Sequence, residues 1–117
     1  MSNLISGDFP TKTHRNINLG ATGVLIKDAK SQIFSMVLCN TAASINYVKL
    51  YDKVTAPANT DTPTHTIALQ ANQTLSVSVG QGIEFVSGIG MRATTGVADN
   101  DNTSPAANAV IVDIHWL

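Results

Sequence analysis

The feature that most constrains the fold is an alternation of apolar and polar side chains with a period of two residues. In residues 74–79, Leu75, Val77 and Val79 alternate with threonine and serine. This is the period of a β-strand with one buried face. No segment repeats its apolar residues at the spacing of about 3.6 residues that an amphipathic helix requires. The pattern therefore predicts an all-β protein.

Glycine, proline, asparagine and aspartate separate the alternating segments, which is the chemistry of turns. Short strands at intervals of roughly 8–12 residues are typical of β-sandwiches. Two long loops among short turns favour jelly-roll or Greek-key connections. We therefore predict an antiparallel β-sandwich of about eight strands. The expected strands lie within residues 14–19, 23–27, 32–40, 45–51, 65–69, 74–79, 83–95 and 109–117.

The apolar patterns also predict which strands are buried and which ones pair. Residues 32–40 are apolar on both faces, so we expect a central strand that is covered on both sides. Residues 45–51 should return antiparallel to it, with Val48 and Leu50 inward and Lys49 on a polar face. Residues 65–69 and 74–79 should form a hairpin with one wet face.

Length and composition describe one domain with an unusually uncharged surface. The chain has 117 residues, of which only 13% are charged, and its net charge is −1. We assign residues 13–117 to a single β-sandwich domain and residues 1–12 to an N-terminal arm. A surface with so few charges is typical of a protein that is covered by copies of itself or by a partner, and equally of a β-protein with a threonine-rich solvent face.

Other features argue against several classes of protein. The seven lysines and arginines are scattered and aromatic residues are few, so we expect no nucleic-acid partner. We expect no membrane span and no secretion signal, which indicates synthesis in a cytosol. Cys39, the only cysteine, lies in an apolar run and should be buried and inert.

Catalytic and metal-binding patterns are also missing from the sequence. His14, His65 and His115 each stand alone, and none has the spacing of a metal site. We expect that the protein is not an enzyme and that it binds no metal and no cofactor. In residues 99–102, side-chain oxygens at alternating positions could bind a cation or form a turn, and the turn is the favoured interpretation.

About the last two-thirds of the chain resembles a group of small β-rich virion proteins of tailed bacteriophages. From Tyr47 the motif reads Y-V-K-L-Y-D-K-x-T-A-P, followed at residues 60–63 by T-D-T-P. Residues 82–101 continue with G-I-x-F-x-x-G-I-G-x-R-A-T-T-G-V-A-D-N-D. The final V-I-V-D-I-H-W fits the closing strand of the same group.

The resemblance implies a capsid decoration, or cement, protein that sits outside the shell of the major capsid protein and clamps its subunits. Proteins of this kind are commonly β-sandwiches or jelly rolls, often homotrimers, and have no catalytic residues to carry over. The protein would then be made in the host bacterial cytoplasm and end up in the virion. We expect contacts with the capsid or with sister subunits from the arm and from the loops at 55–63 and 96–107. The candidate contact residues are Phe9, Pro10, Lys12, Pro57, Asn59, Asp61, Pro63, Asp99, Asp101 and Pro105.

One alternative is a tail- or fibre-associated structural protein with a glycan- or receptor-binding surface. Such a surface needs exposed aromatic side chains, and Tyr47 and Tyr51 are the only aromatic pair on one face of one strand. These tyrosines are more often packed against a second layer of structure. A small hydrolase is a further alternative, but the sequence lacks a set of acid, base and nucleophile.

Overall fold

The computed structural model describes residues 11–117 as eight β-strands. Each expected segment contains a strand, but the first strand begins and ends earlier than predicted, and residues 83–85 continue the strand that begins at Thr74 instead of starting the next one. The strands are β1 (Lys12–Asn16), β2 (Val24–Lys27), β3 (Ser31–Asn40), β4 (Asn46–Tyr51), β5 (His65–Leu69), β6 (Thr74–Phe85), β7 (Ile89–Thr94) and β8 (Val110–Trp116).

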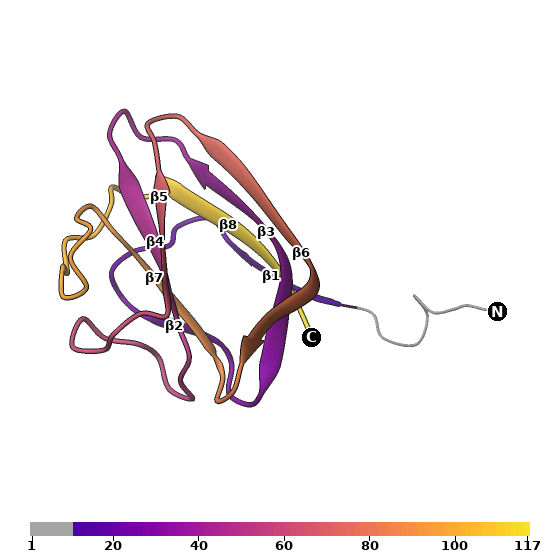
Figure 1. The fold of residues 1–117 in the computed structure, drawn as a ribbon. Helices are drawn as coiled ribbons and strands as arrows, with labels where there is room; N and C mark the ends of the chain where they lie inside the picture. The colour runs from indigo at the N-terminus through magenta and orange to yellow at the C-terminus, as the bar shows by residue number, and fades with distance from the viewer. Residues whose placement is uncertain (1–10) are drawn as a thin grey trace.

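The strands form two sheets that face each other as two layers (Figure 1). The first sheet has the order β1-β8-β3-β6 and the second has the order β2-β7-β4-β5. All neighbouring strands are antiparallel. Eight antiparallel strands in two sheets, with most connections crossing from one sheet to the other, make a jelly roll. The predicted β-sandwich is therefore confirmed.

The core lies between the two sheets and is built by the inward side of each strand. Leu38 and Val112 from the first sheet and Val48, Leu50 and Met91 from the second are all fully buried. Burying each large aliphatic side chain contributes roughly 1.5–3 kcal/mol. The apolar half of the period-two pattern therefore supplies the main stabilisation of the fold.

The structure overturns both predicted pairings of consecutive strands. β5 pairs with β4 in the second sheet, whereas β6 pairs with β3 in the first, so residues 65–79 do not form a hairpin. β3 and β4 likewise lie in different sheets. In each case a turn that looks like a hairpin turn in the sequence carries the chain from one sheet to the other.

Asn40 holds these two crossing connections together. Its buried side-chain Nδ2 donates to the carbonyl oxygens of Ser44, Leu69 and Gln70 at 2.9–3.1 Å. Its Oδ1 accepts from the backbone N–H of Ala42 and from the amide of Asn46. A single amide therefore bonds to backbone groups of both the β3–β4 and the β5–β6 turns, and one of its acceptors is the buried carbonyl oxygen of Leu69.

The predicted double coverage of β3 is also wrong. β3 is a central strand, between β8 and β6, but Val37 is 37% exposed and Cys39 is only half-buried. A β-bulge between Ile33 and Ser35 shifts the register, so that Ile33, Met36 and Leu38 all face the core. The bulge explains the error, since a strict period of two assigns Ile33 and Met36 to opposite faces.

We expect Asn40→Ala to lower the free energy of unfolding by about 2–4 kcal/mol, because the substitution removes a donor from the buried carbonyl group of Leu69 and breaks the hydrogen bonds that join the two turns. Asn40→Asp keeps the side-chain volume but places an acceptor against those carbonyls, so it should be at least as destabilising. Urea denaturation measures both changes. Asn100→Ala, in an exposed loop, is the control and should change stability by less than about 0.5 kcal/mol. Equal urea midpoints for Asn40→Ala and the wild type would contradict this role.

Candidate functional site

The outer face of the neighbouring strands β4 and β7 is largely buried under loops of the chain itself. Lys49 on β4 and Arg92 on β7 are opposite each other in the register, and both are 0% exposed. Tyr51, on the same face, is 1% exposed. The expectation that residues 45–51 have only one buried face is therefore wrong. The covering segments are the two long loops, which lie on the outer side of β4 and β7 (Figure 1).

Arg92 joins β7 to β4, to the loop at residues 95–109 and to the connection between β1 and β2. Its Nε donates to the carbonyl oxygen of Ala21 at 2.8 Å, and one terminal nitrogen donates to the hydroxyl of Tyr51 at 2.9 Å. The other terminal nitrogen donates to the carbonyl oxygen of Asp101 at 3.0 Å and to Oδ1 of Asn102 at 2.8 Å. The guanidinium fork therefore joins two strands and two loops through its fixed, planar set of donors.

Lys49 attaches the loop at residues 95–109 to the sheet at a second point, because its ammonium group donates to the carbonyl oxygen of Ala98. Burial, and after it the charge of Arg92, lowers the pKa of Lys49, while Asp101 and Asp99 act in the opposite direction. The two cations are thus held mainly by carbonyl oxygens and neutral side chains, and the acidic groups lie in the loop above them.

The loop at residues 95–109 is closed on itself by Asp101. The Asp101 carboxylate accepts from the backbone N–H groups of Gly96 and Thr103 and from the Thr103 hydroxyl. The hydrogen bond from Gly96, followed by those from Thr103, lowers the pKa of Asp101 against a smaller opposing effect of desolvation. The Asp101 side chain therefore stabilises a turn, which is the favoured interpretation of residues 99–102 from the sequence. Among residues 11–117, no three His, Cys, Asp or Glu side chains are grouped so that they could hold a metal ion.

The loop between β4 and β5 is closed in a similar way by Asp61. Its carboxylate lies 2.7 Å from the Lys53 ammonium group and accepts from the N–H of Ala58 at 2.8 Å. These interactions, with the Lys53 hydrogen bond first, lower the pKa of Asp61. Pro57 is buried against Gly23 and Gly90, where a Cβ atom would overlap Pro57. The two glycines therefore allow this loop to lie flat on the sheet.

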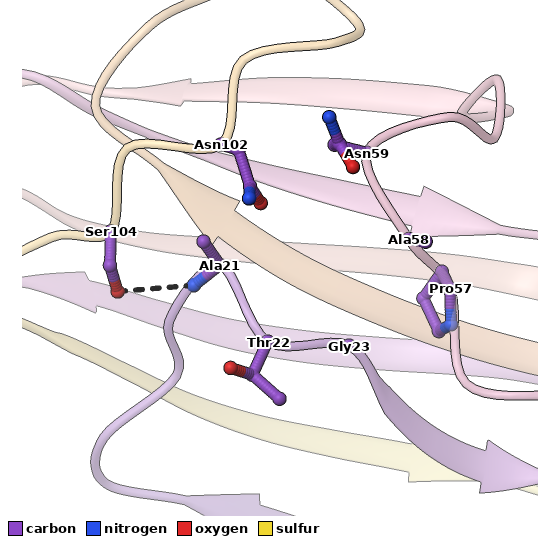
Figure 2. A pocket seen from close by; sticks show the side chains of 8 residues that line it. All are labelled: Ala21, Thr22, Gly23, Pro57, Ala58, Asn59, Asn102 and Ser104. Atoms are coloured by element: carbon purple, nitrogen blue, oxygen red, sulfur yellow. Dashed lines mark hydrogen bonds between the residues drawn. The ribbon is translucent and has the colours of Figure 1, made fainter.

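A hollow of about 400 Å³ opens where the covering segments meet (Figure 2). It is lined by residues 21–23, residues 57–59, Asn102 and Ser104. Figure 2 shows Asn59 and Asn102 on opposite sides of it. The Ser104 hydroxyl accepts from the N–H of Ala21 at 3.1 Å and so joins two sides of the hollow. All of the lining residues are uncharged.

The candidate contact residues fall into three groups. Phe9 and Pro10 lie outside the described residues. Lys12 is exposed on β1, with its ammonium group 5.7 Å from the ring centre of Trp116, far in sequence from both loops. The remaining ones lie in the two loops that the structure brings onto one sheet: Pro57 and Pro105 are buried, Asn59, Asp61, Pro63 and Asp101 are half-buried, and Asp99 is exposed.

The sequence interpretation missed the residues that organise this site, namely Lys49, Tyr51 and Arg92. Lys49 and Arg92 are the only cations in the apolar cores of their segments, and each is followed by a long polar loop. That combination is a usable signal, since a charge inside a central strand must find partners.

Comparison with known proteins adds no assignment: no protein-family model and no curated protein matches the chain. Within residues 11–117, no helix is long and apolar enough to cross a membrane.

We expect Tyr51→Phe to lower the free energy of unfolding by about 1.5–3 kcal/mol, because the buried Arg92 guanidinium loses an acceptor. Tyr47→Phe is the matched control: Tyr47 lies on the same strand and face, and its hydroxyl makes no hydrogen bond among the described residues. It should change stability by less than about 0.5 kcal/mol. Urea denaturation compares the two, and equal losses would show that the Tyr51 hydroxyl does not support Arg92.

We expect Asp101 to make stability depend on acid. Since its pKa is lowered in the folded state, its contribution is present above the ordinary aspartate pKa of about 3.9 and is lost as the pH falls through the folded-state pKa. Asp101→Asn should therefore be less stable at pH 7 and lose less stability below about pH 4. Asp99→Asn, an equal change of charge in the same loop, should follow the wild type. Thermal unfolding from pH 7 to pH 2.5 tests this, and matching curves for the two variants would contradict it.

Proposed function

We propose that this protein is a structural protein of a bacteriophage virion, a capsid decoration protein that binds outside the major capsid shell and stabilises it. In this proposal it is made in the host bacterial cytoplasm and acts as a homotrimer, without a cofactor, a nucleic acid or a membrane. The resemblance of residues 47–101 and of the last strand to virion proteins supports this role. The jelly roll is a fold that viral capsid domains use, although lectins and cupins use it as well.

The observation that carries the proposal is the attachment of both long loops to one sheet, one loop by buried polar residues and the other by the packing of a buried proline. Arg92 and Lys49 hold the loop at residues 95–109, and Pro57 packs the other loop against Gly23 and Gly90. Binding a partner usually costs free energy for the ordering of loops and side chains. Loops that are held before binding avoid much of that cost, which suits a protein that makes many weak contacts on a symmetric shell.

Burial and hydrogen bonding divide the candidate residues into those that shape the surface and those that a capsid could reach. Pro57 and Pro105 are buried, and Asp61 and Asp101 are engaged within their own loops, so these four shape the surface. The partner would be contacted by exposed parts of the loops, such as Asp99 and the half-buried Asn59 and Pro63. The arm, with Phe9 and Pro10, is proposed to reach a neighbouring subunit.

The alternative role, in a tail or fibre with a glycan- or receptor-binding surface, loses the aromatic pair on which it first rested. Tyr51 is 1% exposed and bonded to Arg92, so it is not available to a ligand. A glycan would therefore need another site on this protein.

We expect the purified protein to have the mass of a trimer by light scattering and to co-sediment with capsids that lack it. Deletion of residues 1–10 should weaken this co-sedimentation while leaving the urea midpoint unchanged, because the sandwich begins with β1. A monomer that stays in the supernatant at every capsid concentration would refute the decoration role. Unchanged capsid binding by the truncated protein would refute only the role of the arm.

A further inference from the structure

The hollow between the covering loops has the chemistry of a binding site for an uncharged, hydroxyl-rich ligand. Its volume of about 400 Å³ falls within the range of about 300–1,000 Å³ that ligand pockets occupy. Its polar side chains are the amides of Asn59 and Asn102 and the hydroxyls of Thr22 and Ser104. Amides and hydroxyls both donate and accept hydrogen bonds, as do the hydroxyl groups of a sugar.

The buried Arg92 orients one of these groups. Oδ1 of Asn102 accepts from the guanidinium at 2.8 Å, so the oxygen of the amide is occupied on the protein side. Among the described residues, the Asn102 NH₂ group has no acceptor, and it is the donor that remains for a ligand. Because Arg92 is fixed by three further hydrogen bonds, the direction of this donor is set before any ligand arrives.

Two other polar side chains of the hollow, Ser104 and Asn59, can also form hydrogen bonds with a ligand. The Ser104 oxygen accepts from the N–H of Ala21, which leaves its own hydrogen to be donated. The Asn59 amide makes no hydrogen bond among residues 11–117 and faces the hollow from the other loop. Donors and acceptors therefore converge on the hollow from three segments that are distant in sequence (Figure 2).

The walls exclude two other classes of ligand. None of the lining side chains carries a charge that could neutralise an anion or a cation. The apolar part of the wall consists of Ala21, Ala58 and Pro57, which is too little surface to hold a ligand that binds mainly through apolar contact. A neutral ligand with several hydroxyl groups is the class that matches both observations.

We propose that this hollow binds a neutral saccharide through Asn59, Asn102 and Ser104. The site is independent of the proposed capsid role, since a decoration protein on the outside of a particle and a fibre protein could each present it. A few hydrogen bonds in an open site correspond to weak binding, with a Kd of about 1 mM. Multiple copies on one particle would raise the effective strength of such binding.

The test is a titration of the full-length ¹⁵N-labelled protein with glucose, galactose, mannose, N-acetylglucosamine and their short neutral oligosaccharides, followed by NMR. At least one of these sugars should shift the amide signals of residues 21–23, 57–59 and 102–104 in a saturable way. Glucuronic acid should bind no more tightly than glucose. Shifts confined to other parts of the protein, or no saturable shift with any of these sugars up to about 50 mM, would overturn the proposal.

Two variants and a control locate the site. Asn59→Ala should raise the Kd by about threefold to tenfold, and it removes no hydrogen bond of the described residues. Asn102→Ala should raise it by at least as much, but it also removes an acceptor of Arg92. Asn100→Ala changes the same residue type in the same loop outside the hollow, and should bind like the wild type. Equal affinity of Asn59→Ala and Asn100→Ala would overturn the assignment, whatever the capsid-binding experiment shows.

Discussion

The arrangement of this protein outside its apolar core depends on the burial of one guanidinium group. A buried charge without partners is very costly, so Arg92 can lie under the loops only if its donors are satisfied. The partners are Ala21, Tyr51, Asp101 and Asn102, which belong to three separate segments. The same geometry that satisfies the arginine therefore attaches the loop at residues 95–109 and the β1–β2 connection to the sheet.

The two sheets of the sandwich consequently have different outer faces. In the second sheet, the outer face of β4 and β7 is polar but shielded from solvent by the chain's own loops, as the full burial of Lys49, Arg92 and Thr94 shows. The first sheet presents Val37 and the serine and threonine residues of β6 to the solvent. The second sheet therefore supports loops on its outer side, whereas the outer side of the first sheet faces the solvent.

The fastening of the loops links the architecture to both proposals. Asp61 and Asp101 each close a loop from within, and Arg92 and Lys49 attach one of these loops to the sheet. A surface built in this way gives up little conformational entropy when it meets a capsid or a sugar. The hollow exists because three such segments meet without filling the space between Asn59 and Asn102.

The prediction of the fold class succeeded where the information is local. Strands with one buried face, such as residues 74–79, can be recognised by the alternation of apolar and polar side chains, and turn residues mark where they end. The pairing of strands was predicted wrongly at β3–β4 and at β5–β6, because a short turn can either form a hairpin or change sheets. Asn40, whose side chain bonds to both turns, decides between these outcomes through contacts with residues 29 and 30 positions away.

The candidate site shows the same division. An all-β sandwich with two long loops of low charge could be predicted from the sequence alone, because period-two patterning and turn chemistry act over a few residues. The fold was needed to show that both loops lie on the same sheet, that Lys49 and Arg92 are buried, and that Asn59 and Asn102 face one hollow. These outcomes depend on hydrogen bonds such as that from Arg92 to Ala21, 71 positions away, and no local pattern records a partner at that distance.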